Sequence, residues 1–131
     1  MSTSSEQKIT PYDKLGGEPA LRRLVDRFYE IMDTVRDAQE LRAMHARDLE
    51  PIRAKLFDFM SGWLGGPNRY QQRPDATCIV SAHARFAIGT AETNQWISCM
   101  EQALDDTEAP ADVQQLLRPA LRHAAWSFKN R

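Results

Sequence analysis

The chain is poor in the residues that usually form a metal or phosphate site. It contains three histidines and two cysteines. It has no C-x-x-C, H-x-x-x-H or E-x-x-H spacing, no Gly-rich phosphate loop and no G-x-S-x-G motif. A zinc or di-iron site needs three or more ligands on facing elements. These absences argue against a metal site built from protein ligands alone.

An excess of charge of one sign and a long apolar run are also missing. Seventeen Lys and Arg residues face 18 Asp and Glu residues, for a net charge of -1, which argues against nucleic acid or an anionic membrane as the main partner. No apolar run approaches the roughly 20 residues that span a bilayer. The polar residues 1–7 lack the apolar segment of a secretory signal. We therefore expect no membrane partner and a cytoplasmic location.

The two cysteines, Cys78 and Cys99, could pair with each other. Cys99, however, lies within a helical pattern, and a free buried thiol in a reducing compartment explains it better.

What the sequence does contain is helical periodicity almost throughout its 131 residues, of which 42% are apolar. No segment alternates with a period of two, so we expect an all-α domain with about four major helices and two or three short ones. Four apolar stripes carry this prediction: Leu21, Leu24, Val25, Phe28, Met32 and Val35; Ile52, Leu56, Phe59, Met60 and Trp63; Trp96, Ile97, Met100, Ala103 and Leu104; and Val113, Leu116, Leu117, Ala120, Leu121, Ala124 and Phe128.

Prolines and glycines mark where these helices begin and end. Pro19 suits the first turn of the first major helix, and Pro51 opens the second, which Gly65-Gly66-Pro67 ends. A short helix over residues 76–86 would carry His83. Pro119 falls inside the last stripe and is expected to kink or split that helix.

Few residues could carry chemistry. His83 stands on a short apolar segment, thirteen positions before Trp96. An imidazole in an apolar wall can ligate a metal or a haem iron, and a single histidine ligand implies that a macrocycle supplies the others. The alternative is a helix histidine bonded to a backbone carbonyl. Tyr29 and Trp96 either pack at the edge of the core or direct a phenol and an indole N–H inward. Met100 is better explained as core than as a ligand.

The other two histidines have simpler explanations. His45 and Asp48 share an irregular segment, and Asp48 is best explained as a cap for the helix that begins near Pro51. His123 lies on a face that we expect to be solvated, together with Arg118, Arg122 and Lys129.

Several local motifs occur together in one order. They are Tyr12-Asp13-Lys14-Leu15-Gly16-Gly17; Phe28-Tyr29; Leu41-Arg42-Ala43-Met44-His45 with Asp48-Leu49; Phe59-Met60-Ser61-Gly62-Trp63-Leu64-Gly65-Gly66-Pro67 with Tyr70; His83 with Phe86 and Ile88; and Trp96 with Cys99-Met100. In this combination the chain, from about Pro11 to Lys129, resembles a truncated haemoglobin of group II.

The resemblance implies a two-over-two helical sandwich, in which two antiparallel helix pairs enclose haem b, an iron protoporphyrin IX. It places a flexible extension at residues 1–10 and the globin domain at residues 11–131. His83 matches the proximal iron ligand. Tyr29, Trp96 and His45 match the distal residues, where a phenol and an indole are donors able to stabilise a bound oxygen molecule.

The resemblance also implies the lining of the pocket and exposes departures from the family. Ile52 and Leu56 fall where the distal helix faces the iron, and both are apolar. The family's usual arginine and proline around the proximal histidine are replaced by Ala82 and Arg85, and its usual Gly-His pair by Asp75-Ala76. The substitutes for binding the haem propionates are Arg85, Lys55 and Tyr70, and the remaining lining residues are Phe59, Met60, Phe86 and Met100.

The function implied is the binding of oxygen, nitric oxide and carbon monoxide. One hypothesis is redox chemistry, as a nitric oxide dioxygenase or a peroxidase-like enzyme supplied by an unidentified reductase or other electron donor. Another is storage or sensing without turnover; oxygen transport fits less well, because several donors slow oxygen release. A haem-free helical interaction domain is the third. A mobile His45 could also reach the sixth iron position. The chain could be a monomer or a homodimer.

Overall fold

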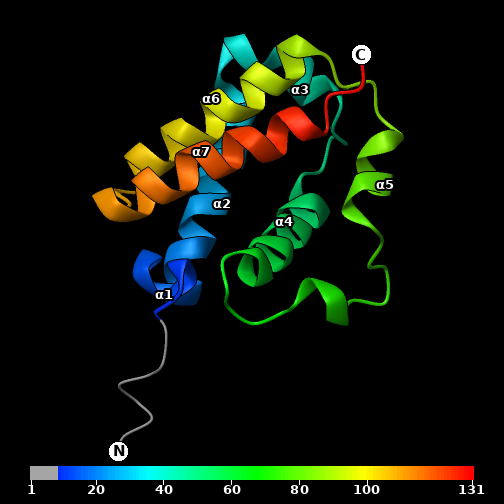
Figure 1. Cartoon of the computed structure of the whole chain (residues 1–131). Coiled ribbons are helices and arrows are strands. Elements are labelled where there is room, and N and C mark those ends of the chain that lie inside the picture. Colours follow the sequence, from blue (N-terminus) through cyan, green and yellow to red (C-terminus); the bar gives the residue numbers. More distant parts are fainter. Residues whose placement is uncertain (1–8) are drawn as a thin grey trace, which may run out of the picture.

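The computed structural model describes residues 9–131, so most of the expected extension at residues 1–10 lies outside the described residues. Two short 3-10 helices, η2 and η3, accompany seven α-helices in this part of the chain (Figure 1). The elements are α1 (Pro11–Leu15), α2 (Gly17–Thr34), η2 (Arg36–Ala38), α3 (Gln39–Ala43), α4 (Glu50–Trp63), η3 (Tyr70–Gln72), α5 (Ile79–Ala84), α6 (Thr90–Asp106) and α7 (Ala111–Ser127).

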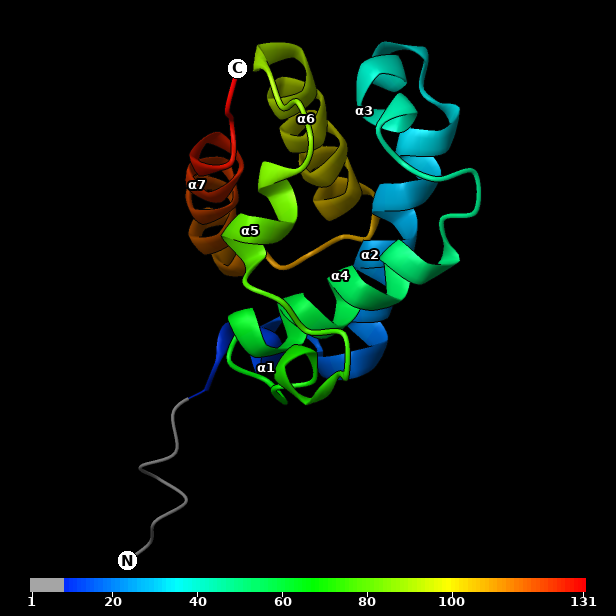
Figure 2. The same cartoon turned by 90° about the vertical axis from the view of Figure 1, so that its right-hand side faces the viewer.

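The four long helices form two layers, α2 with α4 and α6 with α7, and α2 packs directly on α6 between them (Figure 2). No strand occurs within residues 9–131. The predicted all-α, two-over-two sandwich is therefore confirmed. In Figure 1, α5 stands at the edge of the molecule beside α4 and the end of α7.

The core lies where α2 meets α6. Leu24 and Phe28 of α2 and Met100 and Leu104 of α6 are completely buried. They belong to the predicted stripes, because a 3.6-residue period directs one face of each helix to the same interior. The stripes extend too far at some positions, however: Val35, Trp63 and Leu116 are exposed.

Three glycines at the ends of α1 and α4 have a structural reason. Gly16 and Gly17, between α1 and α2, have φ angles of 124° and 73°, in the left-handed region that favours glycine. A Cβ atom at Gly66 would lie 2.5 Å from the ring of Tyr12. Since that distance is far below contact, only glycine allows α1 to dock against the end of α4.

The structure narrows or corrects three predictions about the helices. α7 continues through Pro119 and is not split. Both Pro119 and Gln115 are exposed, so the carbonyl that loses its N–H partner can bond to water. The helix expected over residues 76–86 covers only Ile79–Ala84, and the irregular segment that contains His45 and Asp48 follows directly on the short helix α3.

Several local predictions are confirmed. Cys78 and Cys99 are both free, and Cys99 is buried. The carboxylate of Asp48 accepts a hydrogen bond of 3.1 Å from the backbone N–H of Glu50 and so caps the start of α4. His123 is exposed. Of the helices formed by residues 9–131, none combines the length and hydropathy needed to span a membrane.

Candidate functional site

His83 is held on α5 with one ring nitrogen free. Its Nδ1 lies 2.7 Å from the carbonyl oxygen of Ile79, one turn earlier on the same helix. A carbonyl only accepts, so Nδ1 carries the proton and donates it. The Nε2 of a neutral His83 therefore keeps its lone pair, as a metal ligand requires.

An aromatic ring covers the imidazole of His83. The phenyl ring of Phe128, just after α7, stacks on it with the ring centroids 4.0 Å apart and the planes 10° apart. Sequence reasoning assigned Phe128 only to an apolar stripe. Nothing local in the sequence indicates that it meets a residue 45 positions earlier.

Large apolar side chains of α4 and α6, and one just after α5, are left partly uncovered. Ile52, Leu56, Phe59 and Trp96 pack on the core with one side and remain only partly buried. α5 has no buried side chain, and Phe86, two residues after it, is 42% exposed. Partly uncovered apolar side chains of this kind can cover an apolar cofactor.

The remaining predicted lining residues lie deeper. Met60 and Met100 are buried in the core, beneath the partly exposed apolar side chains. They can support a cofactor site from below rather than form its surface.

A buried phenol lies at the centre of the site. Tyr29 of α2 is 3% exposed, which is deeper than the edge of the core expected from its position in the helical pattern. Burial raises the pKa of its hydroxyl, and the positive charge of Arg53 opposes this shift. Within residues 9–131 no hydrogen bond engages that hydroxyl. Tyr29 thus offers a neutral, uncommitted O–H donor.

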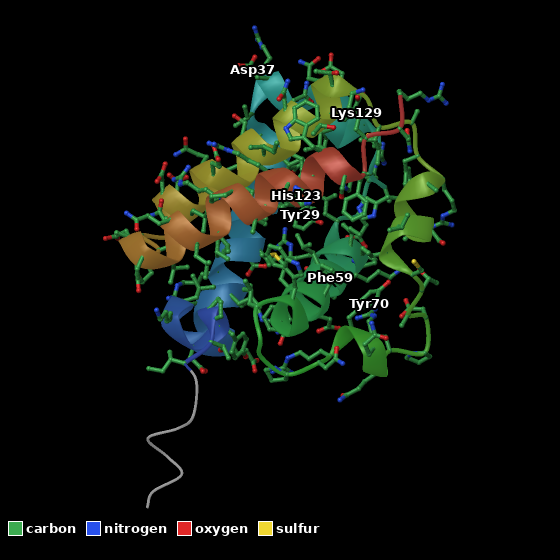
Figure 3. The ribbon with its side chains drawn as sticks, in the orientation of Figure 1. Tyr29, Asp37, Phe59, Tyr70, His123 and Lys129 are labelled. Carbon is green, nitrogen blue, oxygen red and sulfur yellow. The ribbon has the colours of Figure 1, made fainter. Side chains whose placement is uncertain are left out.

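Tyr29, Phe28 and Trp96 form a continuous aromatic group. The ring of Phe28 meets that of Tyr29 edge-on at 4.8 Å and that of Trp96 at 5.3 Å between centroids. This packing connects α2 with α6 and fixes the positions of the phenol and the indole. Figure 3 labels Tyr29 on α2, Phe59 on α4 and Tyr70 on η3.

His45 lies beside Tyr29 as an acceptor. Its Nδ1 donates to the carbonyl of Leu41 at 2.8 Å, so Nε2 of the neutral ring carries the lone pair. Burial lowers the pKa of His45, the charge of Arg42 adds to this, and the Leu41 hydrogen bond opposes it. Near neutral pH, His45 is uncharged and can accept a hydrogen bond at the site.

Arg42 fastens the loop that carries His45. Its guanidinium pairs with Asp33 of α2 at 2.8 Å and donates to the carbonyls of Ala46 and Arg47, each at 3.0 Å. One side chain therefore ties the residues after α3 to the end of α2. Its role is not visible in the sequence pattern, because its partners come from two separate places, Asp33 on α2 and the consecutive residues Ala46 and Arg47.

A surface hollow of about 450 Å³ lies beside the Arg42–Asp33 pair, between the end of α2 and α3. Asp33, Arg36 and Arg42 contribute charged groups to its lining. None of the residues expected around a cofactor lines it, so we assign the site to the apolar faces described above.

The polar edge near α5 is made of paired side chains. Lys55 pairs with Asp75 at 3.4 Å, and the hydroxyl of Tyr70 donates to the carbonyl of Thr77 at 3.0 Å. Arg85 lies over the ring of Phe86, 5.8 Å from its centroid, and forms no ion pair with any of residues 9–131. Of the three predicted propionate ligands, Arg85 is therefore the least committed, whereas Tyr70 fixes the loop before α5.

Arg73, which sequence analysis did not select, closes the same edge. Its guanidinium pairs with Asp58 at 2.6 Å and Asp75 at 2.9 Å, which links α4 to the loop. Nowhere in residues 9–131 do three or more His, Cys, Asp or Glu side chains gather as a metal-binding group.

Comparison with known proteins gives consistent matches over almost the whole chain. The family model for bacterial-like globins matches residues 10–129. The group 2 truncated hemoglobin YjbI of Bacillus subtilis (strain 168) is 30% identical over 120 residues, which cover 92% of this chain and 88% of that protein.

Two solved structures have the same overall fold. The group II 2-on-2 hemoglobin of Agrobacterium tumefaciens has a TM-score of 0.89 and 33% identity, with 95% of this chain and 96% of that chain covered. The cold-adapted truncated hemoglobin of the Antarctic marine bacterium Pseudoalteromonas haloplanktis TAC125 has a TM-score of 0.88 and 34% identity, with 93% and 98% covered.

Proposed function

The chain belongs to the bacterial-like globin family and is thus a haem-binding globin for diatomic gases; on that premise we propose that it uses haem b, held by His83, for redox chemistry of oxygen. Support comes from the freedom of the His83 Nε2, whose ring is fixed by Ile79 and Phe128. The b-type haem is proposed because the chain has no C-x-x-C-H motif for covalent attachment.

In this proposal the residues of the two apolar faces hold the macrocycle. Ile52, Leu56 and Phe59 of α4 form one wall, and Phe86 contributes to the other. Arg85 and Lys55 supply cations for the two propionates, for which Lys55 would exchange its present partner Asp75.

The distal chemistry is assigned to Tyr29, Trp96 and His45. The observation that carries it is the buried, neutral and uncommitted hydroxyl of Tyr29. The Tyr29 O–H and the Trp96 indole N–H can each donate to partial negative charge on a bound ligand. His45 lies beside Tyr29 and can accept a hydrogen bond at the site, because its Nε2 has a lone pair.

Ferrous haem supplies one electron when dioxygen and nitric oxide combine to nitrate, and the ferric haem left behind must be reduced again. Turnover therefore requires an electron donor, for which we propose a reductase. In this scheme the residues of the chain bind the haem and orient its ligands, and they exchange no electrons. If peroxide is the oxidant, the same hydrogen-bond donors, Tyr29 and Trp96, would orient it. Both thiols are free, which suits the reducing cytoplasm where we place the protein.

The proposal is tested by mixing the oxygenated protein with nitric oxide in a stopped-flow instrument and measuring nitrate. We expect rapid conversion to the ferric form, one nitrate per haem and repeated turnover with a reductase. Slow conversion, or a ferric product that resists reduction, would contradict enzymatic use and favour storage or sensing without turnover. A purified protein that takes up no hemin would contradict the haem site itself.

A further inference from the structure

The end of the chain is bound to the segment that follows α5. The backbone N–H of Asn130 donates to the carbonyl of Ile88 at 2.9 Å. Its side-chain Oδ1 accepts from the N–H of Ile88 at 2.9 Å, and its Nδ2 donates to the carbonyl of Phe86 at 2.9 Å. One asparagine thereby satisfies three backbone groups of residues 86–88.

Asparagine suits this position chemically. Its carboxamide presents one acceptor and two donors side by side, as a peptide group does, and can pair with an N–H and a C=O of an extended segment. An aspartate side chain offers hydrogen-bond acceptors only, and an alanine side chain offers neither a donor nor an acceptor. The contact also joins residues 42 and 44 positions apart in the sequence.

This attachment matters because α5 has little else to hold it. None of its side chains is buried, and it packs closely on no other described helix. Its place relative to α7 is therefore set largely by the segments at its two ends. Asn130 fixes the segment after α5, and Phe128, two residues earlier, stacks on His83 at 4.0 Å.

We propose that Asn130 is a positioning residue for His83: by fastening residues 86–88 to the end of the chain, it keeps the Phe128 ring against the imidazole and so sets the plane of that ring. The inference rests on the proposed function, in which His83 is the haem ligand. Two contacts define the plane, the hydrogen bond of Nδ1 to Ile79 and the Phe128 stack. Loss of the stack leaves the hydrogen bond alone, about which the ring can tilt.

The test uses the haem-loaded protein and the variants Asn130→Ala, Asn130→Asp and Phe128→Leu. Asn94→Ala, which removes an exposed asparagine of α6, is the matched control. Resonance Raman spectra of the ferrous, ligand-free form report the iron–histidine stretching band. We expect this band to shift and broaden in all three variants and to stay unchanged in the control. In the two Asn130 variants, transfer of hemin to an apo-globin acceptor should also become about tenfold faster, as expected for the loss of one to two side-chain hydrogen bonds.

A variant that is only destabilised would lose hemin faster without a change in the iron–histidine band. The band therefore distinguishes a positioning role of Asn130 from a purely structural one. Asn130→Asp keeps the shape of the side chain and serves if Asn130→Ala does not fold. In the diamagnetic ferrous carbonyl form of the wild type, a nuclear Overhauser effect should connect the rings of His83 and Phe128. Its absence, or an unchanged stretching band in folded Asn130 variants, would overturn the proposal.

Failure of the proposed function gives a different pattern. In that case the wild type takes up no hemin, or its iron–histidine band survives the change His83→Gly. Such a result overturns the axial assignment and the positioning role together, whereas unchanged Asn130 variants in a protein ligated through His83 overturn the positioning role alone.

Discussion

The rings of Tyr29 and His45 meet edge to face, with their centroids 6.1 Å apart and their planes at 74°. The two residues have opposite hydrogen-bonding roles: one donates and the other accepts. Tyr29 is a protonated donor because burial raises its pKa, and His45 is an acceptor because its Nδ1 is engaged by Leu41. If a ligand binds beside these two rings as proposed, Tyr29 would donate a hydrogen bond to it, and His45 would lie within reach of the same space; the first two predictions test these two roles.

Replacing Tyr29 by phenylalanine should speed oxygen release. The change removes one hydrogen bond to a partially charged ligand and leaves the buried ring in place. Such a bond is worth about 1.5–3 kcal/mol, so the oxygen dissociation rate should rise roughly 10- to 100-fold. Stopped-flow displacement of oxygen by carbon monoxide measures it. Tyr12→Phe is the matched control, since Tyr12 lies on α1 and packs against Gly66; equal rates in both variants would show that Tyr29 does not donate to the ligand.

Arg42→Ala should free the loop that carries His45. The wild-type guanidinium holds Asp33 and two carbonyls of that loop, and its loss should cost about 1–3 kcal/mol of unfolding free energy. We expect the ferric spectrum to gain a low-spin, six-coordinate component as His45 reaches the iron. The double variant with His45→Ala should lose this component. A low-spin component that persists in the double variant would exclude His45 as its source.

How much the sequence could predict depends on how far apart the interacting residues lie. The apolar stripes predicted the long helices and the core, because helical periodicity is a local property. The cap at Asp48 was predictable for the same reason. The resemblance to truncated haemoglobins pointed to His83 and Tyr29, and the structure adds a physical reason for Gly66, which packs against the ring of Tyr12.

The contacts that hold the site escaped prediction because they join distant segments. Phe128 and Asn130 meet α5 and the segment after it only once the chain end has folded back across the molecule. The length of α5 was overestimated for a related reason. Its apolar residues are not buried against other helices, so their pattern contained no signal for where the helix ends.

The stability of the hemin-free protein should fall on mild acidification through His45. Burial lowers the pKa of His45 in the folded state, whereas its value in the unfolded chain is about 6.5. The unfolded state therefore binds more protons below that pH. This contribution to stability is complete above pH ~6.5 and is lost as the pH falls through the lower folded value.

Urea unfolding between pH 7.5 and 5 tests this linkage. The unfolding free energy of His45→Gln should decline less steeply with falling pH than that of the wild type. His123→Gln removes an exposed histidine remote from this contact and is the matched control. Parallel declines in the wild type and His45→Gln would show that His45 does not carry the effect.

The two cysteines should differ strongly in reactivity. The backbone N–H groups of Ser81 and Val80 stabilise the thiolate of Cys78 and lower its pKa, and this thiol is exposed. Burial raises the pKa of Cys99 to about 11. Iodoacetamide at pH 7.5 should therefore modify Cys78 alone in the native protein, as mass spectrometry of tryptic peptides would show. Cys78→Ser should take up no label until urea is added; prompt labelling of Cys99 would contradict its buried position.

His83→Gly should remove the axial ligand and leave a space that free imidazole can fill. The helix tolerates the change at a cost of about 1 kcal/mol in propensity, and no other described side chain depends on a hydrogen bond to this ring. The ferrous variant should lose the five-coordinate spectrum of the wild type and regain it when millimolar imidazole is added. His123→Gly, at an exposed position of α7, should behave as the wild type does. Retention of the wild-type spectrum by His83→Gly without imidazole would mean that another residue binds the iron, and the apolar faces of α4 and α5 would then hold the macrocycle without its histidine.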